Sequence, residues 1–449
     1  MEYRCVLLKS YKSCVFCIAL WLTLGTSCLW AQAALLLGEP YSYDGEFAGT
    51  GHAAVYLARV CADSPTHLRR CKVGEQGVVI SRYHSVAGHD WMAVPLIPYL
   101  YAVRASEDVP LYVDAKLVSF LREQYLSALP LPAEAHPGDE PRYELAGAAY
   151  DRTIYGFRIA TRSEQDDALI RVLNSTPNEE SYKLVNRNCA DFVKQVINFY
   201  YPHAIHRSVI ADLGVTTPKQ AAKSLVHFSK HHREMQLTTF IIPQVPGLKR
   251  SKPVHGVIES LVLAKKYVTP VLLFHPFLVG GVEAAYWAGW RFNPGKDALV
   301  FNVTATNPMT DFDPPLTAAQ RRSYAELIAA VRKSEELDFP SWHHLQSDAK
   351  PQLDAEGGPF LQVPLDGREI PVGICRGNAL RISGSPELVQ HLLLTHLDAE
   401  LRAKKPRVSE QSVKTDWKLL ESAREASRPA LDKHAEDMRG SGTLKVNSE

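Results

Sequence analysis

A lone cysteine at the expected start of an amphipathic helix is the feature that most constrains this chain. After Asn188, apolar residues recur at helical spacing, at Phe192, Val193, Val196, Ile197 and Tyr200. The spacing predicts a helix over 189–201 that begins at Cys189, with Asn188 as its N-cap. A thiol at that position lies near the positive end of the helix dipole, which favours the thiolate. Cys189 is therefore a candidate nucleophile, the alternative being a small buried hydrophobic residue.

A histidine far upstream is the candidate partner for this thiol. Residues 49–58 read as a buried strand, and alternation places His52, Ala54 and Tyr56 on one face. The small neighbours leave room above the imidazole for a helix end or a substrate. His52 could then accept the Cys189 proton and return it to a leaving group. The alternative is a core histidine with satisfied hydrogen bonds.

The order of these motifs resembles a known family. Gly51-His52 precedes an apolar run, a strand-helix-strand pattern covers about 152–187, and Asn188-Cys189 then begins a helix. This order is similar to that of the circularly permuted NlpC/P60-type papain-like fold, which includes the lecithin:retinol acyltransferase-like proteins. The resemblance covers roughly residues 43–201. It implies an α+β domain with an antiparallel sheet, Cys189 as nucleophile and His52 as base, or a degenerate domain that has lost activity.

The resemblance also implies a third polar residue on the next strand, which orients the imidazole. The next expected strand covers residues 77–85, and its polar end offers His84, Tyr83 and Ser81. We prefer His84, because a second imidazole can fix the tautomer of the first. Its alternative is a solvated strand end. Asn188, Tyr56 and Tyr83 are further candidates for orienting the pair or stabilising an oxyanion.

The first 33 residues have the pattern of a secretory signal. Basic residues precede an apolar core, and Ala31-Gln32-Ala33 resembles a cleavage site before Ala34. A lipoprotein signal ending at Cys28 and an uncleaved anchor helix are the alternatives. Each of them implies an exported protein that is periplasmic, secreted or associated with the cell envelope.

The cysteines beyond this segment fit an oxidising compartment. Cys61 and Cys71 flank a short polar segment, which predicts a disulfide that closes a hairpin. Cys375 lies in an apolar run and is expected to be a buried thiol, which leaves Cys189 without a disulfide partner. Because His67 is the only other ligand candidate near the hairpin, we expect no metal site there.

The rest of the chain divides by composition. We expect a signal peptide over 1–33, the papain-like domain over 34–215, a helical and hydrophobic segment over 216–300, a mixed α/β region over 301–428 and a disordered tail over 429–449. Residues 267–290 are long and apolar enough to span a bilayer, although prolines and polar residues interrupt them. We therefore expect either membrane contact through this segment or its burial.

The functional expectation combines these features. The formal net charge is only +1, so the sequence does not favour a nucleic-acid partner. No phosphate-binding glycine loop or paired metal-histidine motif occurs, so we expect no cofactor. The leading hypothesis is an exported cysteine hydrolase that cleaves amide bonds of peptide or cell-wall type. The alternatives are a lipid acyltransferase or esterase of the same fold and an inactive envelope binding module.

Overall fold

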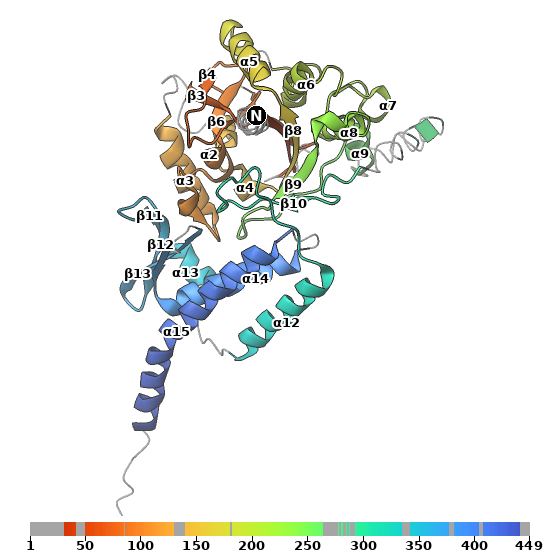
Figure 1. The fold of residues 1–449 in the computed structure, drawn as a ribbon. Helices are drawn as coiled ribbons and strands as arrows, with labels where there is room; N and C mark the ends of the chain where they lie inside the picture. Colours follow the sequence, from red (N-terminus) through yellow and green to blue (C-terminus); the bar gives the residue numbers. More distant parts are fainter. Residues whose placement is uncertain are drawn as a thin grey trace, which may run out of the picture.

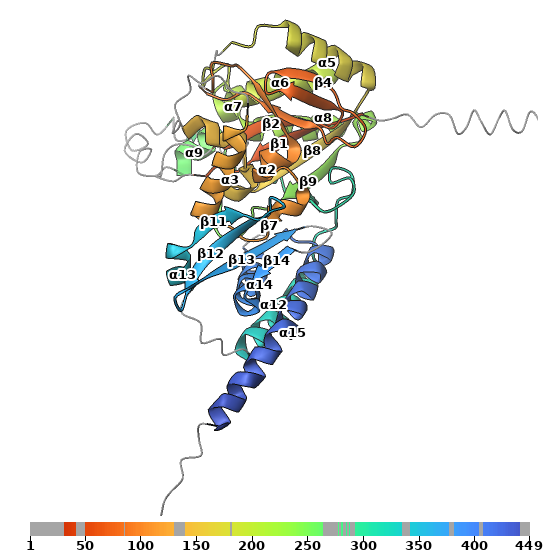
Figure 2. The same ribbon diagram turned by 90° about the vertical axis from the view of Figure 1, so that its left-hand side faces the viewer.

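The computed structural model describes residues 31–440, except 42–49, 85, 130–139, 180–181, most of 264–291, 335–341, 377–380 and 404–406. The fold is mixed α+β, and most strands of its larger sheet come from the first half of the chain (Figure 1). A second sheet and its helices come mainly from the last third of the chain. In Figure 2 this second part lies below the first.

The larger sheet has seven strands in the order β10-β9-β8-β1-β2-β5-β6. All neighbours are antiparallel except β9 and β10, which run parallel. The strands are β1 (Ala31–Gly38), β2 (His52–Leu57), β5 (Val78–Ser81), β6 (Met92–Pro95), β8 (Ile154–Thr161), β9 (Thr238–Ile242) and β10 (Leu299–Val300).

Helices pack on both faces of this sheet, and strand alternation assigns the faces. Ala53 and Val55 of β2 share a buried cluster with α6 (Cys189–Tyr200) and α8 (Pro218–Ser229). Ala54 and Tyr56 instead belong to a cluster with α2 (Leu96–Tyr101), α3 (Ala115–Ser127) and α4 (Ala148–Asp151). Because both faces are covered, the central strands are apolar almost throughout.

Short elements complete this part of the chain. They are the two-stranded sheet of β3 (Val60–Ser64) and β4 (His67–Arg70), α5 (Ser163–Ser175), α7 (Val209–Asp212), α9 (Val257–Leu263) and the 3-10 helices η1 (Ser106–Asp108), η2 (Glu140–Leu145) and η3 (Arg233–Met235). Helix α5 begins at Ser163, with Arg162 as its N-cap.

The second sheet combines residues from both halves of the chain. Its order is β11-β12-β13-β14, and β7 (Val109–Pro110) pairs with β13. The helices beside it share one buried apolar cluster with α2 and α3. The two parts are therefore joined through a strand and a common core. The further elements are β11 (Lys350–Leu353), β12 (Pro359–Leu365), β13 (Arg368–Arg376), β14 (Arg381–Gly384), α12 (Ala318–Ser334), α13 (Trp342–Asp348), α14 (Pro386–Arg402) and α15 (Glu410–Gly440).

Helix α15 is longer than the sequence indicates. It continues to Gly440, whereas we expected a disordered tail from residue 429. Figure 2 shows its last turns extending away from the second sheet. Residues 441–449 lie outside the described part of the chain.

Strand β1 bears directly on the expected signal peptide. Ala31 pairs with Thr161 and Ala33 with Ile159 of β8, and Ala33 also pairs with Leu57 of β2. Cleavage before Ala34 would therefore remove the first part of the central strand. An export signal that ends before Ala31 would leave this strand intact. Residues 1–30 lie outside the described part of the chain, so the signal itself stays a prediction.

Truncation measures what this end of β1 contributes. We expect a chain starting at Ala34 to be about 2 kcal/mol less stable than one starting at Ala31, because it loses several ladder hydrogen bonds worth about 0.5–1.5 kcal/mol each. One of them joins the Ala58 N–H to the Gln32 carbonyl at 2.9 Å. Urea unfolding of the two truncated chains makes the comparison. Equal midpoints would show that residues 31–33 are dispensable for the fold.

Candidate functional site

The start of α6 is fixed by its N-cap, as the sequence predicts. The Asn188 side chain accepts a hydrogen bond from the Asp191 N–H at 2.9 Å, and Cys189 is the first helical residue. The Asn188 amide also donates to the carbonyls of Leu184 at 2.8 Å and Thr216 at 3.0 Å. These contacts occupy the Asn188 side chain in the cap. We had considered this side chain for orienting the pair or stabilising an oxyanion, and in the structure it holds the start of the helix.

A buried ion pair at the end of β5 contacts the start of α6. Arg82 makes two hydrogen bonds of 2.8 Å to Asp90, and both side chains are buried. Arg82 also donates to the Asn188 carbonyl at 3.4 Å, and Arg187 contacts Asp90 at 3.3 Å. The two residues that precede Cys189 are therefore tied to the end of β5.

His52 lies at the start of β2 and is oriented by Ser81. The His52 Nε2 is 3.0 Å from the Ser81 hydroxyl, which also lies 2.7 Å from the Ala53 carbonyl. A hydroxyl has one proton, and the carbonyl can only accept, so Ser81 donates to Ala53 and accepts from His52. The hydrogen-bond network thus assigns the His52 proton to Nε2. Nδ1 then carries the lone pair that a general base needs.

The other sequence candidates lie at different distances from this ring. Tyr83 stacks on His52, with ring centroids 5.4 Å apart and planes at 21°. His84 is exposed and instead packs edge-on against Tyr182 at 5.2 Å. Tyr56 is buried further along β2 among the α2 cluster. Ser81, rather than His84, therefore makes the contact expected of an orienting residue.

Cys189 lies close to this group, through the residue that follows His52. Its sulfur interacts with the backbone N–H of Ala53, the residue that follows His52. Burial raises the pKa of Tyr83, the residue stacked on His52. Tyr99 and a Cys189 thiolate add smaller effects in the same direction. Within the described residues, no hydrogen bond joins the Cys189 sulfur to the His52 ring.

Burial decides the charge state of both groups. It raises the pKa of Cys189 to about 11, outweighing the lowering by the N–H groups of Ala53 and Ala190. Burial, together with the Arg152 charge, lowers the pKa of His52 to about 3. The sequence predicts a lowered thiol pKa from the helix dipole. That expectation is wrong in sign for the resting chain, because Cys189 is only 8% exposed. At neutral pH the pair is a thiol and a neutral imidazole.

The His52 pKa makes the folded chain sensitive to acid. Its value of about 3 lies below the ordinary value of 6.5, so the neutral ring stabilises the fold fully above pH 6.5. This contribution is lost as the pH falls from 6.5 toward 3. Because His52 keeps part of its surface exposed, we expect a loss of about 2 kcal/mol, less than the full shift would give. Urea unfolding from pH 7 to pH 4 should show this loss in the natural chain and not in His52→Gln. Parallel pH profiles would contradict it.

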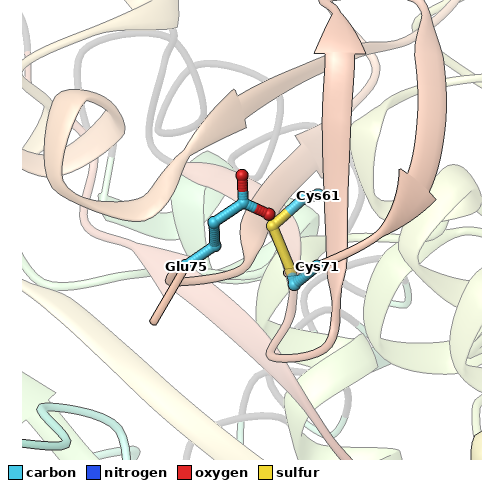
Figure 3. Close-up of side chains that lie close together, drawn as sticks. All are labelled: Cys61, Cys71 and Glu75. Atoms are coloured by element: carbon cyan, nitrogen blue, oxygen red, sulfur yellow. A yellow bond between two sulfur atoms is a disulfide. The ribbon is translucent and has the colours of Figure 1, made fainter. Parts of the chain in front are cut away.

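The Cys61–Cys71 disulfide is present, as predicted. It joins β3 to the end of the β3–β4 hairpin, and Figure 3 shows Glu75 beside it. The ligand atoms of Cys61, Cys71 and Glu75 lie within 4.8 Å of one another, which resembles a metal site. The sulfurs are bonded to each other, however, and Glu75 pairs with Arg69 at 2.6 Å. Thiolate ligands are therefore absent from this group while it is oxidised.

The expected membrane segment is mostly outside the described residues, which include only isolated positions of 267–290. Among the helices that the structure describes, none combines the length and apolar character needed to cross a bilayer.

Arg152 is a site residue that the sequence does not reveal. It follows α4, and its charge acts on both His52 and Cys189. A single arginine before a strand carries no motif, so only the fold brings it to the pair. Ser81 was visible as a candidate, but the strand register was needed to choose it.

Comparisons with known proteins identify no family for the chain. No family model matches the chain, and no curated protein matches it. One solved structure is similar to 48% of this chain and 93% of its own, with 14% identity and a TM-score of 0.24. It is the crystal structure of a Type VI secretion system effector, TseH. The described residues themselves form a mixed α+β fold.

Proposed function

We propose that this chain is an exported cysteine hydrolase that cleaves amide bonds of peptide or cell-wall type. The observation that carries the proposal is the position of His52, whose Nε2 is held by Ser81 while Cys189 contacts the next residue, Ala53. This arrangement leaves Nδ1 of His52 without a proton, and the Cys189 thiol at the helix start contacts the residue next to His52. It is the chemistry of the permuted papain-like fold that the sequence resembles.

The neutral resting pair sets the order of steps. His52 Nδ1 accepts the Cys189 proton as the sulfur attacks the carbonyl carbon, so base and nucleophile act together. The backbone N–H of Cys189 and the Tyr83 hydroxyl are the proposed oxyanion donors. The Tyr83 hydroxyl is buried and has no hydrogen-bond partner within the described residues. His52 then protonates the leaving amine, and water hydrolyses the thioester.

The disulfide supports the proposed location. Disulfides persist in the periplasm and outside the cell, and they are rare in the cytosol. The Cys61–Cys71 bond closes a hairpin next to β2, the strand that carries His52. An oxidising compartment would therefore preserve the local structure beside the proposed site.

One observation favours a second candidate, an envelope binding module without activity. The Cys189 thiol is buried, and burial raises its pKa to about 11, which disfavours the thiolate. Nucleophilic cysteines usually have a lowered pKa. In this alternative, the site would bind a peptide without cleaving it.

Product analysis tests the proposal. The purified chain and Cys189→Ala are incubated separately with cell-wall peptides and with acyl esters, and products are identified by mass spectrometry. We expect new amines and carboxylates from peptides, with the natural chain only. Release or transfer of acyl groups would replace this substrate class with lipid esters. Binding of peptides without products, unchanged in Cys189→Ala, would establish the binding module instead.

A further inference from the structure

A buried arginine beside the proposed catalytic pair forms no ion pair within the described residues. The Arg152 side chain is 7% exposed, and its Nε has no hydrogen-bond partner. Within the described residues, its guanidinium forms no ion pair. The guanidinium carbon lies 4.2 Å from the centroid of the Tyr41 ring, which is a cation–π contact. Glu144 and Asp151 act on the Arg152 pKa from a distance, after burial and Tyr41. The guanidinium therefore lacks a direct ion pair, although these nearby groups together outweigh burial and raise the Arg152 pKa.

Other buried cations in the described part of the chain are compensated. Arg82 pairs with Asp90 at 2.8 Å, and Lys219 pairs with Glu259 at 2.5 Å. Arg122 pairs with Asp151 and also donates to two carbonyls. A buried charge without a direct partner is costly, and a bound ligand of opposite charge would offset that cost. Arg152 differs from these residues in that respect.

The backbone places this charge next to His52. Gly38 of β1 lies opposite His52 in the ladder, and the Arg152 side chain crosses over Gly38. A Cβ at Gly38 would be 2.7 Å from the Arg152 Cδ, so the glycine leaves the space that Arg152 uses. Burial has the largest effect on the pKa values of His52 and Cys189. The Arg152 charge lowers both pKa values by a smaller amount. Arg152 thus borders the space beside both residues.

We propose that Arg152 binds a carboxylate of the substrate beside Cys189, so that the chain acts on acidic peptides. This inference rests on the proposed function and specifies its substrate class. The Tyr41 ring lies over one face of the guanidinium, and the buried Nε has no hydrogen-bond partner. A planar fork of this kind matches the edge of a carboxylate, with two parallel hydrogen bonds. A bound carboxylate would also supply a direct ion pair, which Arg152 lacks within the described residues.

Paired alkylating reagents test the inference without a known substrate. Iodoacetate carries a carboxylate and iodoacetamide is neutral, and both lose iodide as the Cys189 sulfur forms a bond to carbon. Alkylation of Cys189 in the full chain is followed on its proteolytic peptide by mass spectrometry. We expect the rate ratio of iodoacetate to iodoacetamide to be about tenfold higher in the folded chain than in urea. In Arg152→Gln the ratio should fall to the value in urea.

The ratio is the readout because loss of the Arg152 charge also raises the Cys189 pKa, which slows both reagents equally. Arg187→Gln is the matched control, since this exposed arginine precedes Cys189 by two positions and pairs with Asp90. It should keep the high ratio. If Arg152→Gln does not fold, a protection experiment on the natural chain replaces it. Acetate should slow the alkylation of Cys189 by iodoacetamide, and acetamide should not.

The outcomes separate the two proposals. If iodoacetamide modifies folded Cys189 but the ratio equals that in urea, carboxylate binding is overturned and the hydrolase proposal stands. If neither reagent modifies Cys189 until the chain unfolds, the hydrolase proposal fails, and the Arg152 inference fails with it. A high ratio that Arg187→Gln lowers as much as Arg152→Gln would indicate a general surface potential and would also overturn the inference.

Discussion

We expect His52→Ala to hydrolyse its substrate about a thousandfold more slowly than the natural chain at pH 7. General acid–base catalysis typically contributes about 10²–10⁴-fold. The share of His52 should be large, because the Cys189 thiol has a pKa of about 11 and cannot ionise unaided at neutral pH. The measurement is kcat/KM on the peptide that product analysis identifies. A loss below tenfold would mean that another group takes the thiol proton.

Ser81 and His84 provide the comparison that makes this prediction specific. Ser81→Ala removes the hydrogen bond to His52 Nε2, so we expect a loss of about ten- to a hundredfold in kcat with little change in KM. His84→Ala removes a ring that packs on Tyr182 and should cost less than Ser81→Ala. The reverse order would restore the interpretation that the sequence favoured, in which His84 orients His52.

The helix and the strand that carry Cys189 and His52 could be predicted from local sequence patterns. The apolar spacing after Asn188 predicted a helix over 189–201, and α6 covers Cys189–Tyr200. The alternation over 49–58 predicted the strand that is β2. Both patterns are strong because each element buries a long apolar surface, and burial enforces the period. Strand β1 was missed for the opposite reason: its alanines and leucines follow an apolar segment and read equally well as the end of a signal peptide.

The choice among Ser81, Tyr83 and His84 depended on a long-range relation. Strand β5 ends at Ser81, and its register with β2 pairs Ile80 with Val55. Register decides which side chain lies against His52, and a shift by one residue would turn every side chain to the other face. Nothing local encodes that register. The same holds for Arg152, which reaches His52 only because β1 lies between β2 and β8.

The charge state of the pair could not be inferred from the helix dipole. The dipole favours a thiolate at the first turn, and the sequence shows the helix start clearly. Desolvation acts in the opposite direction and depends on what covers the thiol. Here β2 and its neighbours bury Cys189, so burial dominates. A sequence pattern indicates the field of one helix, whereas the pKa depends on the whole surrounding shell.

The other large effect concerns the ion pair that holds the start of α6. We expect Asp90→Ala to lower the free energy of unfolding by about 3–5 kcal/mol, because it leaves Arg82 buried without a counter-charge. Asp63→Ala is the matched control. The Asp63–Arg69 pair is shorter, at 2.6 Å, but Asp63 is 59% exposed, so water replaces the lost partner. Urea unfolding of the two variants compares them directly.

The same variant tests whether this pair positions the nucleophile. Arg82 donates to the Asn188 carbonyl, so losing Asp90 should release the residues that precede Cys189. Iodoacetamide should then modify Cys189 faster in Asp90→Ala than in the natural chain, under conditions in which both are folded. Asp63→Ala should leave the rate unchanged. Equal destabilisation by the two variants would show that distance, rather than burial, determines the strength of these pairs, and the Arg82–Asp90 contact would lose its assigned role in holding α6.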